Sequence, residues 1–356
     1  MGVTIPRAAF LLAVLAIAAP AADKAPQWLT ELATRELPEY DSDVLAAVLF
    51  HERRVTVSEE GKVTTSVRKA VKILSRDGRG EARGSVIYRT DTGKVQSLRG
   101  WTIYASGEER SYGKKDIADV SLADNDVYNE SRLKLVSGSS AADPGSVFGY
   151  ESVQEDRSIF TQFSFDFQDD LPALTSRFRL QLPAGWTAES VTHNHAEIEP
   201  LVQGSSYTWQ LQHLPPIGDE PARPPITAIA PRVNVSYYPP PGAGNAGPTF
   251  EDWGQVSTWL ASLNDPRAVP DDSISSKAQS LVEGKSSELE RISAIAKYAQ
   301  EINYVSIQIG AGRGGGYQPH AAAEVFQKAY GDCKDKANLM RAMLKSVGVE
   351  SYPVAI

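Results

Sequence analysis

The chemistry of this sequence centres on its single cysteine, which lies in the run Tyr330-Gly331-Asp332-Cys333-Lys334-Asp335-Lys336-Ala337. A lone thiol cannot form an internal disulfide, and charged neighbours at the start of a helix make it a candidate nucleophile. The alternative is a small buried apolar residue, since free cysteine is commonly buried. On the local sequence we favour the nucleophile.

The residues that follow predict a helix from about Cys333 to Val347, with the thiol in its first turn. Asp332 is a good N-cap because its side-chain oxygen can accept a free backbone N–H, and Asp335 can close a reciprocal cap. Gly348 can take the left-handed conformation that ends a helix. Apolar residues recur at helical spacing: Ala337, Met340, Leu344 and Val347.

Charge around the thiol determines how readily it forms a thiolate, which is the reactive species. A helix start favours negative charge because unpaired N–H groups and the helix dipole point toward it. Lys334 and Lys336 add positive charge to this environment, whereas Asp332 and Asp335 oppose it. The sign of the net effect on Cys333 stays open at this point.

Two further runs precede the thiol, and a third continues from it: Gly316-Tyr317-Gln318-Pro319, Ala323-Glu324-Val325-Phe326 and Ala337-Asn338-Leu339. Together they resemble the nucleophile segment of the transglutaminase-like (papain-like) superfamily. The segment is most similar to exported bacterial proteins that join this domain to an N-terminal β-rich "domain of unknown function 3857". The resemblance implies a Cys-His-Asp triad with Cys333 as the nucleophile. The histidine and aspartate that it implies would follow Ile356.

Residues 22–238 predict a β-rich domain, because short runs of alternating polar and apolar residues are separated by turn signals such as Asp77-Gly78. The predicted strands are Val63–Leu74, Ser85–Arg89, Gly100–Tyr104, Leu133–Leu135, Phe160–Phe167, Ser176–Leu182, Tyr207–Leu211 and Arg232–Tyr238. Many short strands with regular turns are typical of an antiparallel β-sandwich. Runs at 145–150, 167–172 and 207–209 resemble the domain of unknown function 3857, for which no activity is established.

A Pro/Gly-rich linker, residues 239–248, precedes the second domain, residues 249–356. In this domain we expect a helix capped by Thr249 and Asp252, a loop over 264–272, further helices at 287–301 and 320–328, and a strand at 351–356. The helix after Asp252 should present Trp253 on its apolar side, and the next should present Leu289. The predicted fold class is multidomain α+β: an antiparallel β-sandwich followed by an incomplete transglutaminase-like (papain-like) domain.

Other polar groups that precede the thiol in the sequence are weaker candidates for a catalytic role. Gln308 or Gln318 could donate to an oxyanion, as a glutamine does in the papain-like enzymes that the segment resembles, although a structural loop role is also open for each. His320 is a possible general base, but in the resembled superfamily the base follows the cysteine in the chain. We therefore expect His320 to lie at a helix start without a catalytic role. The glycine-rich run 310–317 lacks the βαβ context and lysine of a nucleotide site.

No metal or cofactor is expected. Two histidines and two glutamates alternate at His193, His195, Glu197 and Glu199, and we expect a solvated strand face or hairpin tip there. His51 and His213 are expected to be structural. Five aromatic residues of the β-rich domain could form a sugar-binding platform, although core packing is the commoner role for such residues. They are Trp101, Tyr104, Trp186, Tyr207 and Trp209.

Residues 1–21 are typical of a secretory signal peptide, with Arg7 ahead of an uncharged run and small residues at Ala19 and Ala21. We therefore expect a periplasmic or secreted protein that is not integral to a membrane after cleavage. No cysteine lies near the cleavage point, which excludes lipoprotein anchoring. The net charge of −8 argues against a nucleic-acid partner.

Two functions remain in competition. The first is thiol-dependent acyl transfer on amide bonds of a protein or peptide substrate, of the protease, amidase or transglutaminase type. The resemblance implies that the base and its orienting acid lie outside these residues, so we expect little or no activity from this polypeptide alone. The alternative is a non-enzymatic periplasmic binding or scaffold protein with a β-sandwich recognition domain. The substrate and the oligomeric state are open.

Overall fold

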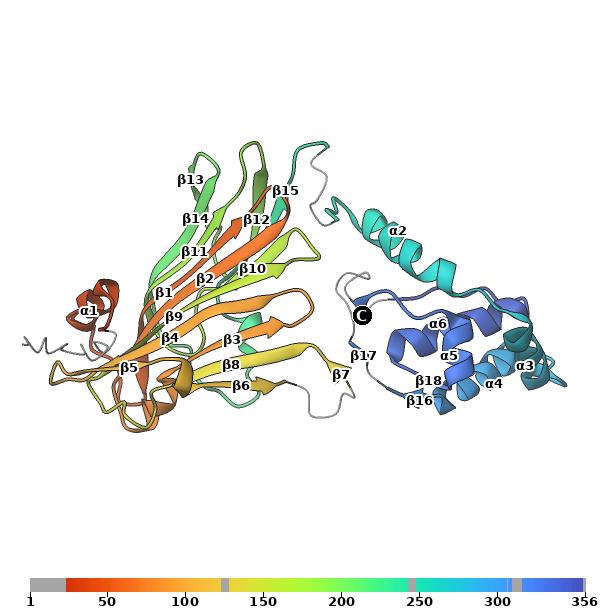
Figure 1. The fold of residues 1–356 in the computed structure, drawn as a ribbon, viewed down its shortest axis with the longest axis horizontal. Helices are drawn as coiled ribbons and strands as arrows, with labels where there is room; N and C mark the ends of the chain where they lie inside the picture. The colour runs from red at the N-terminus through yellow and green to blue at the C-terminus, as the bar shows by residue number, and fades with distance from the viewer. Residues whose placement is uncertain (1–23, 123–127, 243–247, 306, 309–315, 355–356) are drawn as a thin grey trace, which may run out of the picture.

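The computed structural model describes residues 24–122, 128–242, 248–305, 307–308 and 316–354. The predicted signal peptide and most of the glycine-rich run lie outside these residues. Figure 1 shows a β-rich part followed by a helical part beside it. No helix among the described residues has the length and apolarity needed to cross a membrane.

An eight-stranded sheet dominates the β-rich part, in the order β13-β14-β11-β1-β2-β9-β4-β5. Its strands are β1 Ala46–Val57, β2 Lys62–Ile73, β4 Lys94–Ile103, β5 Glu109–Tyr112, β9 Val147–Arg157, β11 Ala173–Gln181, β13 Leu201–Gln203 and β14 Ser206–Leu214. β1 pairs with β11 in parallel, and the other pairings of this sheet are antiparallel. Alternation of side chains is the same in both directions, so the sequence pattern does not reveal the parallel pair.

Two three-stranded sheets pack against the inner face of the large sheet (Figure 1). They are β10-β15-β12 (Gln162–Asp166, Arg232–Tyr238, Thr187–His193) and β3-β8-β6 (Arg83–Arg89, Ser131–Ser137, Ile117–Ser121). Stacked aromatic rings fill the space between the sheets: Phe178 lies 5.4 Å from Phe165 and 5.6 Å from Trp209, measured between ring centroids. The multidomain α+β class with a multi-sheet β domain is therefore confirmed.

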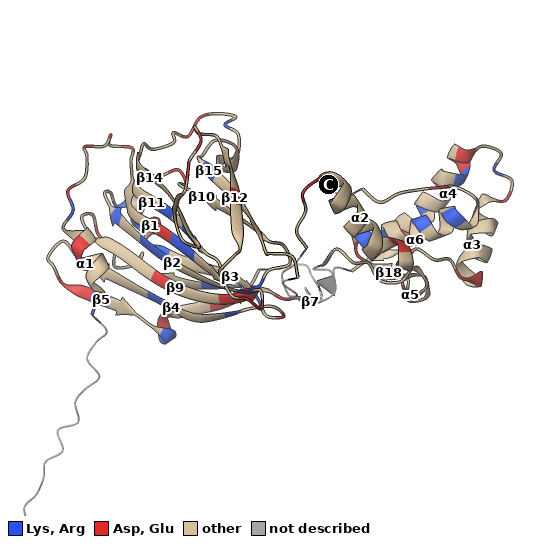
Figure 2. Cartoon of the chain, turned by 90° about the horizontal axis from the view of Figure 1, so that it is seen from above, with Lys and Arg blue, Asp and Glu red and all other residues tan. Residues whose placement is uncertain are grey.

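The outer face of the large sheet carries many charged residues, and α1, Gln27–Ala33, covers an apolar cluster on it that includes Leu29, Leu49 and Trp101. Figure 2 shows charged residues along β1, β2, β9 and β11. Glu52 is buried there and is paired with Arg177 at 3.2 Å and Arg179 at 3.3 Å. Leu29 of α1 lies so close to Gly149 that a Cβ on this glycine would come within 2.5 Å of it. The glycine is therefore required for the helix to dock.

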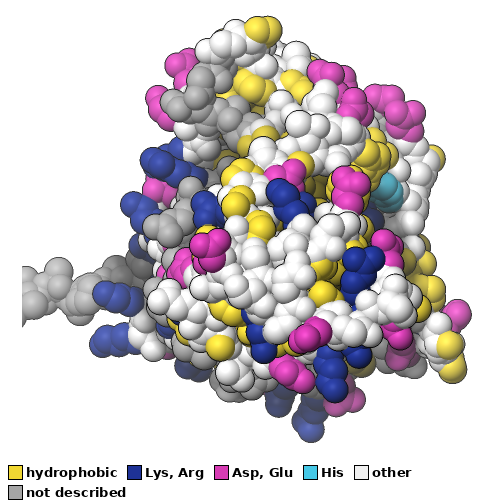
Figure 3. All heavy atoms as spheres, turned by 90° about the vertical axis from the view of Figure 1, so that its right-hand side faces the viewer, with side chains coloured by type: hydrophobic (Ala, Val, Ile, Leu, Met, Phe, Trp, Pro, Cys, Tyr) yellow, Lys and Arg dark blue, Asp and Glu magenta, His cyan; other side chains and the backbone are white. Residues whose placement is uncertain are grey.

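The helical part contains α2 Trp253–Asn264, α3 Asp272–Val282, α4 Glu288–Glu301, α5 Ala322–Lys328 and α6 Cys333–Ser346. Short helical turns and two-residue strands complete the chain: η1 Asp77–Glu81, η2 Lys114–Asp116, η3 Ile226–Ala228, η4 Asp265–Arg267, β7 Tyr128–Asn129, β16 Asn303–Tyr304, β17 Ile307–Gln308 and β18 Tyr330–Gly331. A separate core joins α3, α4, α5 and α6, with fully buried Ile274, Ile295, Leu339 and Met343. Charges of both signs are interspersed over the end of this part (Figure 3).

Several local predictions need correction in this region. The predicted loop over 264–272 contains the helical turn η4, and the helix α3 was not predicted; it begins at Asp272 because the Asp271 side chain accepts a hydrogen bond from the Ile274 N–H. Trp253 is 85% exposed and Leu289 is 72% exposed, so neither lies on a packed face. The predicted strand is absent from the described residues 351–354. A strand needs a hydrogen-bonded neighbour, and no described strand pairs with this segment.

Aromatic side chains connect the two parts of the chain. Phe160 follows β9, and its ring lies 5.5 Å from Trp259 of α2 and 5.6 Å from Tyr317, measured between ring centroids. Phe250 lies 5.5 Å from Trp259 and joins the same cluster. The turn before α5 is therefore packed on the β-rich part.

Candidate active site

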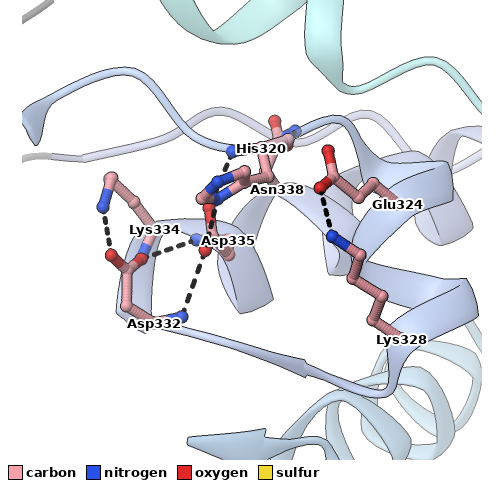
Figure 4. Close-up of polar contacts among 7 residues, drawn as sticks. All are labelled: His320, Glu324, Lys328, Asp332, Lys334, Asp335 and Asn338. Carbon is pink, nitrogen blue, oxygen red and sulfur yellow. Dashed lines mark hydrogen bonds and ion pairs between the residues drawn. The ribbon is translucent and has the colours of Figure 1, made fainter. Parts of the chain in front are cut away.

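The cysteine helix α6 begins with the predicted reciprocal cap (Figure 4). One Asp332 oxygen accepts hydrogen bonds from the Lys334 N–H at 3.1 Å and the Asp335 N–H at 3.2 Å. The Asp335 carboxylate accepts one from the Asp332 N–H at 3.2 Å. Both carboxylates are buried. The cap fixes where the helix starts, and with it the place of Cys333 in the first turn.

Asp335 also holds the loop that precedes α5. Its Oδ1 accepts the His320 backbone N–H at 2.7 Å, and its Oδ2 lies 3.0 Å from His320 Nδ1. The Asn338 amide reaches the His320 carbonyl at 3.4 Å (Figure 4). A Cβ on Gly331 would lie 2.6 Å from the Asp335 Cβ, so this position has no room for a side chain. One buried carboxylate therefore joins the helix start to the loop at His320.

Cys333 is exposed, in contrast to its buried neighbours Asp332 and Asp335. The His320 ring is held by Asp335, and no hydrogen bond joins it to Cys333 among the described residues. Among the described residues no hydrogen bond is made by the Cys333 N–H. The helix start therefore presents a solvent-accessible sulfur next to a free backbone donor.

The two lysines beside the thiol are engaged elsewhere. The Lys334 ammonium pairs with the Asp332 carboxylate. The Lys336 ammonium donates to the backbone carbonyls of Gln300 at 3.0 Å and Ile302 at 2.7 Å, at the end of α4. The charges of Asp332 and Lys334 thus offset each other, and the Lys336 ammonium is bonded to the end of the neighbouring helix. The positive contribution at Cys333 comes from the helix start.

The two glutamine candidates have different outcomes. The Gln318 amide lies against the guanidinium of Arg267 in η4, and in the orientation that satisfies both groups its oxygen accepts a hydrogen bond from Arg267 Nε at 2.8 Å. Gln308 pairs with Asn129 through its backbone, between β17 and β7, and its side chain lies outside the described part of the structure. Neither glutamine is brought to Cys333 by a contact among the described residues.

The remaining histidines lie in the β-rich part. The His193 ring is 3.0 Å from the Asn234 amide, and His195 bonds the Ala196 carbonyl at 2.8 Å. No group of three or more metal-ligating side chains occurs among the described residues. His213 has a positive φ of 54° at the end of β14, and His51 lies against Phe165 between the sheets. The tryptophans of the suspected sugar platform are buried in the cores: Trp101, Trp186 and Trp209.

The hydrogen-bond partner of Asp335 on the preceding loop could not be found from the sequence. Its carboxylate was expected to cap the helix, and that role is confirmed. Its second role needs His320, which lies 15 residues earlier. No helical or strand periodicity relates positions at that spacing, because a loop, α5 and β18 intervene. A buried acidic residue in a first helical turn is the one signal that would suggest an additional partner.

Two family models match the chain. Residues 59–218 match the Domain of Unknown Function DUF3857, of which a structure has been solved, and residues 275–355 match the transglutaminase-like superfamily. No curated protein matches the sequence.

One solved structure has a similar fold over most of this chain. A crystal structure of a "putative protease" from Parabacteroides distasonis ATCC 8503 is similar with a TM-score of 0.66 and 16% identity, over 86% of this chain and 59% of that chain. This chain therefore spans less than two thirds of the length of that protein. At such low identity the likeness shows the fold alone.

Two weaker matches carry no argument. Yeast LTA4 hydrolase in complex with Bestatin has a TM-score of 0.28 and 11% identity, over 59% of this chain and 33% of that chain. An M1 zinc metallopeptidase from Deinococcus radiodurans has a TM-score of 0.28 and 12% identity, over 54% of this chain and 42% of that chain. The fold, the capped cysteine helix and the two family models lead to one assignment: the chain belongs to the proteins that join a DUF3857 domain to a domain of the transglutaminase-like superfamily.

Proposed function

We propose that Cys333 is the nucleophile of an exported enzyme that transfers acyl groups from amide bonds of proteins or peptides. The observation that carries this proposal is the exposed thiol in the first turn of α6, beside a backbone N–H without a partner among the described residues. The thiol proton passes to a base, the sulfur attacks the amide carbonyl carbon, the C–N bond breaks, and the base returns the proton to the leaving amine. The acyl-thioester then passes its acyl group to water or to a second amine.

The free Cys333 N–H supports this chemistry, because it can donate to the oxygen that becomes negative when the sulfur attacks. Asp332 and Asp335 act as positioning residues, since they hold the helix start at which both the sulfur and the donor lie. Neither carboxylate is free to act as a general base. Asp335 already accepts from two residues, and Asp332 accepts from the turn that it caps.

The general base is proposed to come from polypeptide outside residues 1–356. His320 is the single histidine of residues 249–356, and its ring is bound to Asp335. A base must reach the proton that it removes within hydrogen-bond distance or through one water. We therefore propose that this chain alone turns over amides little or not at all.

The test compares hydrolysis of a fluorogenic peptide amide by residues 1–356 and by a polypeptide extended past Ile356, each with Cys333 and with Cys333→Ala. We expect turnover by the extended form, its loss in Cys333→Ala, and no measurable turnover by residues 1–356. Equal turnover by both lengths would contradict the proposed source of the base. Turnover that persists in Cys333→Ala would contradict the nucleophile.

Export is part of the same proposal, and the charge and small-residue pattern of residues 1–21 supports it. Expression in a bacterial host followed by fractionation should give a periplasmic or secreted protein whose first residue is Ala22. A cytoplasmic product that begins at Met1 would contradict both the signal peptide and the location.

A further inference from the structure

An open pocket lies between α2 and the loop that leads into β10, where the β-rich and helical parts meet. Its volume is about 410 Å³, which is within the range that holds small molecules. Five aromatic side chains line it: Phe160, Phe250, Trp253, Trp259 and Tyr317. None of the five is buried, so the pocket presents aromatic surface to solvent.

One apolar face of α2 forms a wall of this pocket. Trp253, Val256 and Leu260 recur at helical spacing, and all three line the pocket. None of the three is buried, and Asn264 is the only buried residue of the helix. A helix in a folded domain usually buries its apolar face. This face of α2 is therefore left uncovered by the described residues.

The charged side chains of the pocket are all negative. Among the described residues that line it, only Glu251 and Asp252 carry a charge. One Asp252 oxygen accepts the Gln255 N–H at 2.8 Å, and the Glu251 carboxylate is met by the neutral Gln255 amide at 3.4 Å. Neither carboxylate forms an ion pair within the described part of the chain, so both negative charges are uncompensated there.

Arginines near this region belong to other surroundings. The Arg267 guanidinium lies against the Gln318 amide. Arg157 lines a neighbouring hollow, which shares Phe160 with this pocket and also contains Asp156. The carboxylates at the start of α2 thus have no cationic side chain beside them in the pocket itself.

Aromatic rings and unpaired carboxylates favour the same kind of ligand. The face of an aromatic ring attracts a cation, and the attraction is strongest for tryptophan. A carboxylate adds attraction between opposite charges, whereas an anion in this pocket would meet two negative groups. A neutral apolar ligand would gain nothing from Glu251 and Asp252. The charge complementarity of the pocket therefore selects a cation.

We infer that this pocket binds an ammonium group carried on an apolar body, as in a free organic amine or a basic side chain of a polypeptide. Glu251 and Asp252 supply the charge, and the Trp253 ring supplies a face for the cation. Phe160 and Trp259 contact the apolar body. Binding at this site does not depend on the activity proposed for Cys333.

The experiment uses residues 1–356 labelled with fluorotryptophan, in which six fluorine signals report on the six tryptophans. Trp253→Phe and Trp259→Phe assign the two signals of the pocket. The probe is phenylbutylammonium, and phenylbutanol and phenylbutanoate are its neutral and anionic counterparts. N-acetyl-lysine amide represents the polypeptide source, with N-acetyl-norleucine amide as its neutral counterpart.

A double variant, Glu251→Gln with Asp252→Asn, removes both charges and keeps the helix cap, because asparagine also caps helices. The matched control is Asp271→Asn with Asp272→Asn, an adjacent acidic pair that begins α3 and does not line the pocket. Trp253→Leu replaces the ring by an apolar side chain. Since Trp253 is 85% exposed, this change leaves the packed core intact.

We expect phenylbutylammonium to shift the Trp253 and Trp259 signals saturably at millimolar concentration, and phenylbutanol to bind at least about threefold more weakly. Phenylbutanoate should bind more weakly still. The double variant should weaken binding of the ammonium by about fivefold and Trp253→Leu by about threefold, whereas the control pair should leave it unchanged.

Saturable shifts by N-acetyl-lysine amide, absent with N-acetyl-norleucine amide, would support a polypeptide source, and shifts by phenylbutylammonium alone would support a free amine. The inference is overturned when neither signal moves, when the alcohol binds as tightly as the ammonium, or when the double variant binds the ammonium as tightly as its control.

Discussion

Replacing Asp335 by alanine should destabilise the helical domain more than any surface change, because this one carboxylate serves two segments. It is buried and accepts from the His320 N–H, from the His320 ring and from the Asp332 N–H. Removing it leaves two backbone donors near the helix start without their partner. Each such donor, when buried, costs about 1–3 kcal/mol.

The expected loss is therefore about 2–4 kcal/mol of the free energy of unfolding of this domain, from two donors at about 1–2 kcal/mol each, the lower part of the range being used because His320 is partly exposed. Asp335→Asn is also expected to be harmful, by about 1–2 kcal/mol. Its Oδ2 faces both the His320 ring and the Asp332 N–H, and an amide NH2 in that place would oppose two donors.

The assay is urea unfolding followed by circular dichroism at 222 nm, with the β-rich and helical transitions fitted separately because two domains need not unfold together. Hydrogen exchange of the His320 and Asp332 amides gives a local measure. Glu324→Gln is the control, since Glu324 is half-exposed on α5, pairs with Lys328 at 2.7 Å, and among the described residues makes no hydrogen bond to the helix start. A loss below about 1 kcal/mol for Asp335→Ala, or a loss equal to that of the control, would refute the reasoning.

Three further predictions concern other parts of the fold. Lys336→Met should cost the helical domain about 1–3 kcal/mol in urea unfolding, because its ammonium bonds two carbonyls at the end of α4; an unchanged midpoint would contradict this. In the unfolded chain His51 has its ordinary pKa of 6.5, whereas in the folded chain its pKa is about 3. The unfolded chain therefore binds more protons between pH 3 and 6.5, and the free energy of unfolding rises with pH over this range. His51→Phe should remove up to about 2 kcal/mol of the stability change between pH 5 and 7.5, and a variant with the wild-type pH profile would contradict the burial of a neutral ring. Hydrogen bonds led by the Ser287 N–H lower the pKa of Glu290 to about 2. The stabilisation of the folded state by the Glu290 carboxylate is therefore complete above pH 4.5 and is lost as the pH falls toward 2. Glu290→Gln should flatten acid unfolding in that window, and an unaltered acid transition would count against the cap.

Local signals in the sequence were sufficient for the elements that position the thiol. Asp332 and Asp335 predicted the start of α6, and Ser287 lies where α4 begins. Side-chain caps are short-range interactions, so they can be recognised within four residues. The faces of the helices were predicted less well. Ala337 is exposed, and the fully buried face carries Leu339, Ala342 and Met343.

Longer-range relations could not be predicted. The parallel pairing of β1 with β11 joins strands more than 100 residues apart, and nothing in either strand specifies direction. Lys336 was expected near the thiol, yet its long side chain reaches the end of α4. His51, Lys69 and Tyr150 become neighbours only when strands β1, β2 and β9 are in register. In each case the partner is set by the fold and not by neighbours in the chain.

The most direct test of the account is acylation of Cys333 by p-nitrophenyl acetate, followed by intact-protein mass spectrometry. The sulfur would form a bond to the acetyl carbon as p-nitrophenolate leaves, and this step needs no general acid for the leaving group. We predict a single acetyl group on residues 1–356, formed faster on the folded chain than in urea at the same pH and absent from Cys333→Ala. An acetyl group that survives Cys333→Ala, or a rate that is no faster in the folded state, would contradict the claim that the start of α6 activates this thiol.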